Sequence, residues 1–137
     1  MNRPLALAAL ALAAGCASSL PATERGDLVR GIVATTVQLR AEREGGGRRA
    51  ASGVVVASDP ASRRAWIVTA RHFVHPPRRQ DVMVRQPGRR TWVKASIAFV
   101  SSDLDLALVE VAGLDLVPAR LRPTAALGDE ILLVAFP

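Results

Sequence analysis

The sequence has one cysteine, no tyrosine, one lysine and two histidines among its 137 residues. A single cysteine excludes a disulfide within the chain. The longest apolar run, residues 5–14, is ten residues long, which is half of the roughly 20 residues that a transmembrane helix needs. Because the arginines are not interleaved with aromatic residues, the chain lacks a base-stacking platform. We therefore do not expect nucleic acid as a partner.

The N-terminus has the pattern of a secretory signal. Arg3 precedes the apolar run, and small residues follow it. The order Leu-Ala-Ala-Gly-Cys at residues 12–16 resembles the lipobox of bacterial lipoprotein precursors, which implies that Cys16 is lipidated and becomes the mature N-terminus. An ordinary signal peptide, cleaved near Ala17, is the alternative. In either case we expect secretion across the inner membrane, to the periplasm or to a membrane through a lipid on Cys16.

The chain is basic, with 18 Lys+Arg against 12 Asp+Glu and a net charge of +6. All cations but one are arginine, and four Arg-Arg pairs lie in or beside expected loops, at 48–49, 63–64, 78–79 and 89–90. We interpret this charge as solvated loop charge. A basic β-domain that binds anionic envelope polymers stays open as an alternative.

Hydrophobic residues recur mainly with period two, which is typical of half-buried strands. We expect a signal peptide over 1–16, a tether over 17–27 and one β-domain over 28–137. The glycine-containing segment 40–49 is expected to be a flexible loop, and no segment predicts an amphipathic helix. Turn signals about every ten residues favour an all-β fold, a single antiparallel barrel of six to seven strands. The expected strands are 33–39, 54–57, 66–70, 81–85, 91–100, 106–111 and 131–136.

Two polar residues sit where apolar strands meet turns. His72 follows the run "AWIVTA", and Asp105 leads into a strand that is apolar on both faces. A carboxylate buried there needs a hydrogen-bond donor, and an imidazole N–H is a suitable one. An aspartate that merely starts a strand is the alternative for Asp105. His75, before two prolines, is expected in a loop, and Asp103 after two serines in a turn.

The stretches "IVTARHFV" and "DLDLALVEV" together resemble the histidine and aspartate elements of trypsin-like (chymotrypsin-fold) serine peptidases. The absence of cysteines near the histidine, with "ASGVVVAS" and "LGDEILLVAFP", makes the chain similar to the bacterial HtrA/Deg-like branch. The resemblance spans 28–137 and departs at Ala51, where glycine is common, and at Arg71, where a small or polar residue is usual. It implies the first barrel of a double barrel, closed by the last apolar strand, with His72 as general base and Asp105 as its orienting partner. Proteins or peptides are then the substrates, with no cofactor and no metal.

The third member of such a triad, a serine, would follow the aspartate in the sequence. No serine follows Asp105, so the nucleophile, oxyanion hole and specificity pocket of a second barrel are not encoded. We therefore expect the N-terminal half of a serine endopeptidase, inactive as given, because losing the nucleophile alone costs about a million-fold in kcat. A non-catalytic barrel that binds a partner is the alternative.

Overall fold

Six strands and two helices make up the fold in a computed structural model that describes residues 22–76 and 80–136. The predicted signal peptide and Cys16 lie outside these residues, so the division at residues 16 and 27 stays a prediction. The elements are α1 (Ala22–Ala34), β1 (Thr36–Arg43), β2 (Arg48–Asp59), β3 (Arg64–Thr69), α2 (Arg71–Val74), β4 (Gln80–Arg85), β5 (Val93–Val100) and β6 (Ala107–Ala112).

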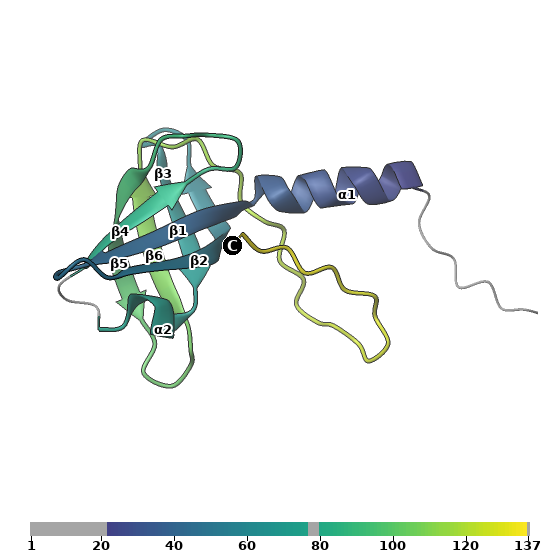
Figure 1. Cartoon of the computed structure of the whole chain (residues 1–137). Coiled ribbons are helices and arrows are strands. Elements are labelled where there is room, and N and C mark those ends of the chain that lie inside the picture. The colour runs from purple at the N-terminus through teal and green to yellow at the C-terminus, as the bar shows by residue number, and fades with distance from the viewer. Residues whose placement is uncertain (1–21, 77–79, 137) are drawn as a thin grey trace, which may run out of the picture.

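The strands close into a barrel in the order β1-β2-β3-β6-β5-β4 (Figure 1). Every neighbouring pair is antiparallel. The predicted all-β antiparallel barrel is therefore confirmed, with six strands. The pairing of β1 with β4 closes the barrel. The strand order also places β3 directly beside β6, with Thr69 aligned to Ala107. The chain segments that carry the two predicted site residues consequently leave the barrel at the same end.

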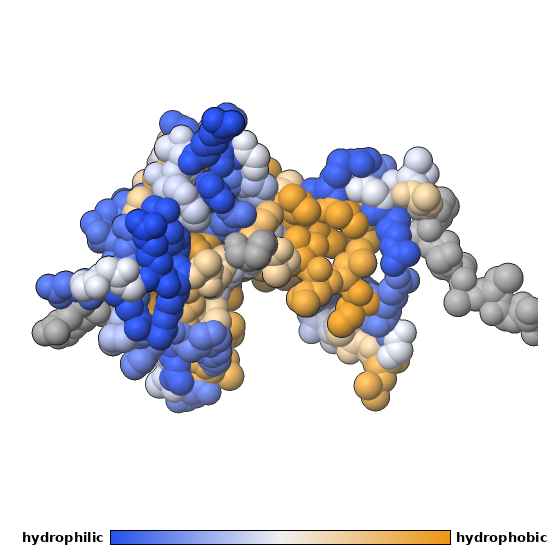
Figure 2. All heavy atoms as spheres, viewed as in Figure 1, coloured by the Kyte–Doolittle hydropathy of each residue, from blue (hydrophilic) through white to orange (hydrophobic). Residues whose placement is uncertain are grey.

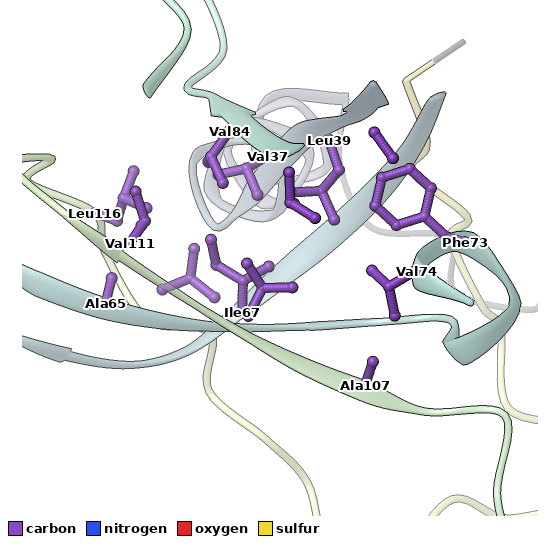
Figure 3. Close-up of a cluster of buried hydrophobic side chains, with 14 residues drawn as sticks. Val37, Leu39, Ala65, Ile67, Phe73, Val74, Val84, Ala107, Val111 and Leu116 are labelled. Atoms are coloured by element: carbon purple, nitrogen blue, oxygen red, sulfur yellow. The ribbon is translucent and has the colours of Figure 1, made fainter. Parts of the chain in front are cut away.

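Every second side chain along the strands points into the barrel, and these side chains fill its interior, as expected for a barrel of this small size. Along β3, alternate residues are fully buried while the residues between them face outward. The same alternation appears in β1 and β6. The buried cluster, drawn in Figure 3, consists of Val37, Leu39, Ala41, Val55, Ala65, Ile67, Phe73, Val74, Val82, Val84, Ala107, Val109, Val111 and Leu116.

Gly53 allows β2 to approach the core more closely than any side chain would permit. A Cβ atom at this position would lie 2.4 Å from Cγ2 of Ile67 and 3.0 Å from Cδ1 of Leu39. These distances are shorter than van der Waals contact between carbon atoms allows. The glycine of the "SGVVV" stretch is therefore required by packing against two neighbouring strands.

The short helix α2 seals one end of the barrel. Phe73 is 3% exposed and Val74 is fully buried, and Figure 3 shows both side chains reaching from α2 towards the cluster. Burying each such side chain contributes about 1.5–3 kcal/mol. These two residues fix the helix on the barrel, and with it the exposed His72 that precedes them.

The first departure from the sequence prediction is α1, which covers part of the expected tether and the start of the strand expected at Val33. Leu28 and Ile32 lie four residues apart, so they share one face of the helix. The helix ends where the hydroxyls of Thr35 and Thr36 donate to the carbonyl of Ile32, at 3.0 and 2.8 Å. In the described part of the chain, neither helix is long and apolar enough to span a bilayer.

Two more expectations were wrong. The segment 40–49 is a tight hairpin rather than a long loop, because Gly45 and Gly46 adopt positive φ angles of 94° and 91°. The segment 131–136 forms no strand, so the closing of the barrel by this segment does not occur. Its Leu132 instead lines an apolar hollow with Leu28 and Ile32 of α1. Figure 2 shows apolar surface gathered where α1 and this segment meet.

Candidate active site

His72 owes its position to the way β3 ends. The strand stops at Thr69, whose hydroxyl donates to the carbonyl of Ser52 on β2 at 3.0 Å. After Ala70 the chain turns into α2, which directs Phe73 and Val74 inward. His72, on the opposite side of this single turn, keeps 78% of its side chain exposed. The buried Phe73 and Val74 that follow the histidine, together with the anchored end of β3 before it, thus hold it at the rim.

Asp105 lies in the loop between β5 and β6, which we call the acid loop and define as residues 101–106. The backbone N–H of Ser101 donates to the carbonyl of Leu106 at 3.0 Å and closes the base of the loop. The hydroxyl oxygen of Ser101 accepts from the N–H groups of Asp103 and Leu104, at 3.3 and 3.0 Å. The two serines therefore form the turn that the sequence indicated, and Asp105 follows it.

The structure brings His72 and Asp105 together through two contacts. The backbone N–H of His72 donates to Oδ1 of Asp105 at 2.9 Å, and Nδ1 of the ring lies 2.7 Å from Oδ2. The hydrogen bond from the imidazole, followed by that from the backbone, lowers the pKa of Asp105 below its usual value, with smaller contributions from the charges of His72 and Arg71. An ionised carboxylate accepts hydrogen bonds only, so the proton of this contact lies on Nδ1, and in a neutral ring Nε2 is the nitrogen that can accept a proton.

Asp105 is not buried, contrary to the sequence expectation. Its side chain is 54% exposed, because β6 begins two residues later, at Ala107. Solvation and the two His72 contacts, rather than a buried environment, satisfy this carboxylate.

The other two acid–base candidates do not join the pair. His75 lies after α2, as expected for a loop residue, and its side chain is exposed. Asp103 lies in the same loop as Asp105, but its carboxylate accepts from the hydroxyl of Ser102 at 2.7 Å. Among residues 22–76 and 80–136, no serine hydroxyl is hydrogen-bonded to the ring of His72, and no three metal-ligating side chains cluster.

Three arginines contact the site, and the sequence interpretation gave none of them a role. Nη1 of Arg71 donates to the carbonyls of Ser101 and Ser102, at 3.2 and 2.8 Å. Arg49 reaches the carbonyl of His72, and Arg43 that of His75, both at 2.7 Å. The one available signal was the unusual arginine directly before the histidine.

Comparison with known proteins gives a family and a fold. The model of the trypsin-like peptidase domain matches residues 51–137, whereas no curated protein matches the sequence. Among solved structures, the chain is similar to Rv3671c from M. tuberculosis H37Rv, crystallised as a serine-to-alanine mutant in an inactive form. The TM-score is 0.58 at 19% identity, over 80% of this chain and 49% of that one. The present chain thus spans about half of that chain's length. Because the family model matches more than half of the sequence, the chain belongs to the family of trypsin-like peptidase domains.

Proposed function

We propose that this barrel supplies the acid–base half of a serine endopeptidase, with His72 as general base and Asp105 as the group that orients it. The observation that carries the proposal is the 2.7 Å contact between Nδ1 of His72 and Oδ2 of Asp105. An ionised aspartate at this nitrogen selects the tautomer whose Nε2 can accept a proton. Family membership supports the same assignment, because the histidine and aspartate stand in the order typical of trypsin-like peptidases.

The proposed chemistry is acyl transfer. Nε2 of His72 removes the proton from a serine hydroxyl as the serine oxygen attacks the scissile carbonyl carbon of a protein or peptide. The Asp105 carboxylate then stabilises the imidazolium, which returns the proton to the leaving amine. Nδ1–H remains bonded to Asp105 throughout, so the carboxylate fixes the ring and takes no proton.

The serine itself must come from outside the barrel, because no serine follows Asp105 in this sequence. The matched Rv3671c chain is about twice as long as the part covered by this barrel. We propose that a second β-rich segment, with a Gly-x-Ser-Gly nucleophile loop, completes the enzyme, and that the whole is similar to the HtrA/Deg-like branch. Secretion and a lipid on Cys16 would place it in the periplasm or on a membrane; both belong to the proposal.

The test is to translate the DNA beyond the codon for Pro137, in frame and after one frameshift, and to assay the complete protein on an unfolded protein substrate. His72→Ala should lower kcat by about 10⁶-fold, and Asp105→Asn by about 10⁴-fold. The matched controls are His75→Ala and Asp103→Asn, neither of which removes a group from the His72–Asp105 pair. Both controls should keep activity within about threefold of wild type.

Two outcomes would refute the assignment. Equal losses from His72→Ala and His75→Ala would mean that the wrong histidine was chosen. A folded complete protein with a Gly-x-Ser-Gly loop but no peptidase activity would favour a non-catalytic barrel that binds a partner.

A further inference from the structure

The His72–Asp105 pair is open to solvent in this chain, which spans about half of the matched peptidase chain. The two side chains are 78% and 54% exposed. Water competes for both partners of such a pair, so their mutual attraction alone holds the geometry weakly. In this barrel by itself, other contacts therefore hold the acid loop so that Asp105 stays on Nδ1 of His72.

Arg71 provides these contacts. Its Nη1 donates to the carbonyl of Ser102 at 2.8 Å and to that of Ser101 at 3.2 Å. Its backbone N–H donates to the carbonyl of Asp105 at 3.2 Å. The side chain thus binds the first half of the acid loop, while the backbone binds the residue that bears the carboxylate.

Within the described residues, the hydrogen bonds between α2 and the acid loop come from only two consecutive residues. Arg71 makes three of them, and His72 makes two, through its backbone N–H and its ring. The bonds made by Ser101 lie inside the loop, so they shape it without joining it to α2. Removing the Arg71 side chain would leave the carbonyls of Ser101 and Ser102 without their charged donor.

We propose that Arg71 is a positioning residue that fixes the acid loop on α2 so that the Asp105 carboxylate meets Nδ1 of His72. Its significance for catalysis rests on the function proposed above. The three hydrogen bonds from Arg71 to the acid loop are called the clamp below. The resemblance to trypsin-like peptidases predicts a small or polar residue at this position, so the clamp belongs to this sequence rather than to the general family pattern. A guanidinium suits the role because its fixed fork of donors keeps its charge at any ordinary pH.

The share of His72 that carries its proton on Nδ1 tests this role, and it can be measured in the given chain without the serine nucleophile. The full chain, with ¹⁵N-labelled histidine, is studied by long-range ¹H–¹⁵N NMR in a buffer in which the imidazole is neutral. Asp105→Asn defines the tautomer share without the carboxylate. Arg71→Met keeps an apolar stem but removes the donors, and should lower the Nδ1–H share to about half of its wild-type value. Arg71→Lys should restore part of it.

The matched control is Arg64→Met. Arg64 is the first residue of β3, at the end of the strand away from α2, where it pairs with Glu110 at 3.2 Å. This variant should leave the His72 tautomer unchanged. A wild-type Nδ1–H share in folded Arg71→Met would overturn the proposal. If Arg71→Met does not fold, Arg71→Ala decides, because it places the small residue usual for the family at this position and also removes the donors: a reduced share supports the clamp, and a wild-type share overturns it.

The two proposals fail separately. If His72→Ala in the complete enzyme left peptidase activity intact, the proposed function would be wrong, although the tautomer change in Arg71→Met would still establish the clamp. If the enzyme needed His72 but Arg71→Met changed neither the tautomer nor kcat, the clamp alone would be wrong. If both proposals hold, Arg71→Met in the complete enzyme lowers kcat and leaves KM nearly unchanged, because Arg71 acts on the base and not on the substrate.

Discussion

Nη1 of Arg49 donates a hydrogen bond of 2.7 Å to the carbonyl oxygen of His72, the residue whose ring contacts Asp105. Arg49 lies near the start of β2, where it pairs with Ala41 of β1 in the β1–β2 hairpin. The last carbonyls of any helix have no hydrogen-bond donor within the helix, and basic side chains near the helix end can donate to them. His72 is therefore held through its backbone carbonyl as well as through its ring.

The first prediction concerns this carbonyl. Arg49→Ala should lower the free energy of unfolding by about 0.5–1 kcal/mol, since the lost bond is exposed. It should also speed amide hydrogen exchange at Phe73, whose N–H donates to Ala70 across the single turn of α2. Arg48→Ala is the control, because its charged contact is Glu42 at 3.6 Å. Equal exchange rates in the two variants would contradict the role given to Arg49.

A second prediction tests the tight packing at Gly53. Gly53→Ala would place a methyl group 2.4 Å from Cγ2 of Ile67, and such overpacking costs about 1–3 kcal/mol. Urea denaturation should show a lower midpoint with an unchanged slope. Gly31→Ala in α1, where a Cβ meets nothing within 4 Å, should not lower the midpoint, because alanine is favoured over glycine inside a helix by about 0.5–1 kcal/mol. A neutral Gly53→Ala would refute the packing argument.

The barrel could be predicted because its information is local. Alternation around Val54, Ile67 and Val109 sets which face of each strand is buried, and turns such as Gln86-Pro87-Gly88 mark where strands end. The pairing of His72 with Asp105 depends on the strand order, which places β6 beside β3 although β4 and β5 lie between them in the sequence. Sequence order alone does not give that neighbour relation, and the resemblance to a family supplied it.

What could not be predicted depends on three-dimensional context. Val33, Thr35 and Val37 alternate like a strand, yet the helical spacing of Leu28 and Ile32 prevails up to Ala34. The apolar segment 131–136 reads as a strand but pairs with no other strand in the described part of the chain. The contact of Arg71 with two backbone carbonyls leaves no pattern in the sequence, because every residue carries a backbone carbonyl.

The third prediction follows from the lowered pKa of Asp105, caused first by the hydrogen bond from the His72 ring. A carboxyl whose pKa is lower in the folded state stabilises the fold above its unfolded pKa of about 3.9, and this contribution is lost as pH falls through the folded value. The stability difference between wild type and Asp105→Asn should therefore be constant above about pH 5 and shrink on further acidification. Chemical denaturation at a series of acidic pH values measures it.

Asp59 provides an internal comparison for that experiment. Its pKa is lowered too, first by the hydroxyl of Ser62 and then by the N–H of Ala61. Asp59 is the last residue of β2 and pairs with Arg64, at the end of β3 away from α2 and the acid loop, so its contribution should add independently to that of Asp105. Asp59→Asn should remove a separate part of the acid dependence without changing the His72 tautomer. If the free energy of unfolding depended on pH as strongly in the double variant, Asp59→Asn with Asp105→Asn, as in wild type, then other groups would dominate the acid dependence.

The last prediction separates packing from exposure in two phenylalanines. Phe73, which belongs to α2, is 3% exposed, whereas Phe99 on β5 is 62% exposed. Phe73→Ala should cost about 3–5 kcal/mol, because it opens a cavity at the sealed end of the barrel. Phe99→Ala should change the free energy of unfolding by less than about 0.5 kcal/mol. Because α2 also positions His72, any Phe73→Ala protein that still folds should lose the Nδ1–H tautomer preference, and Phe99→Ala should keep it. A folded Phe73→Ala variant with an intact tautomer would show that the acid loop alone suffices to place the histidine.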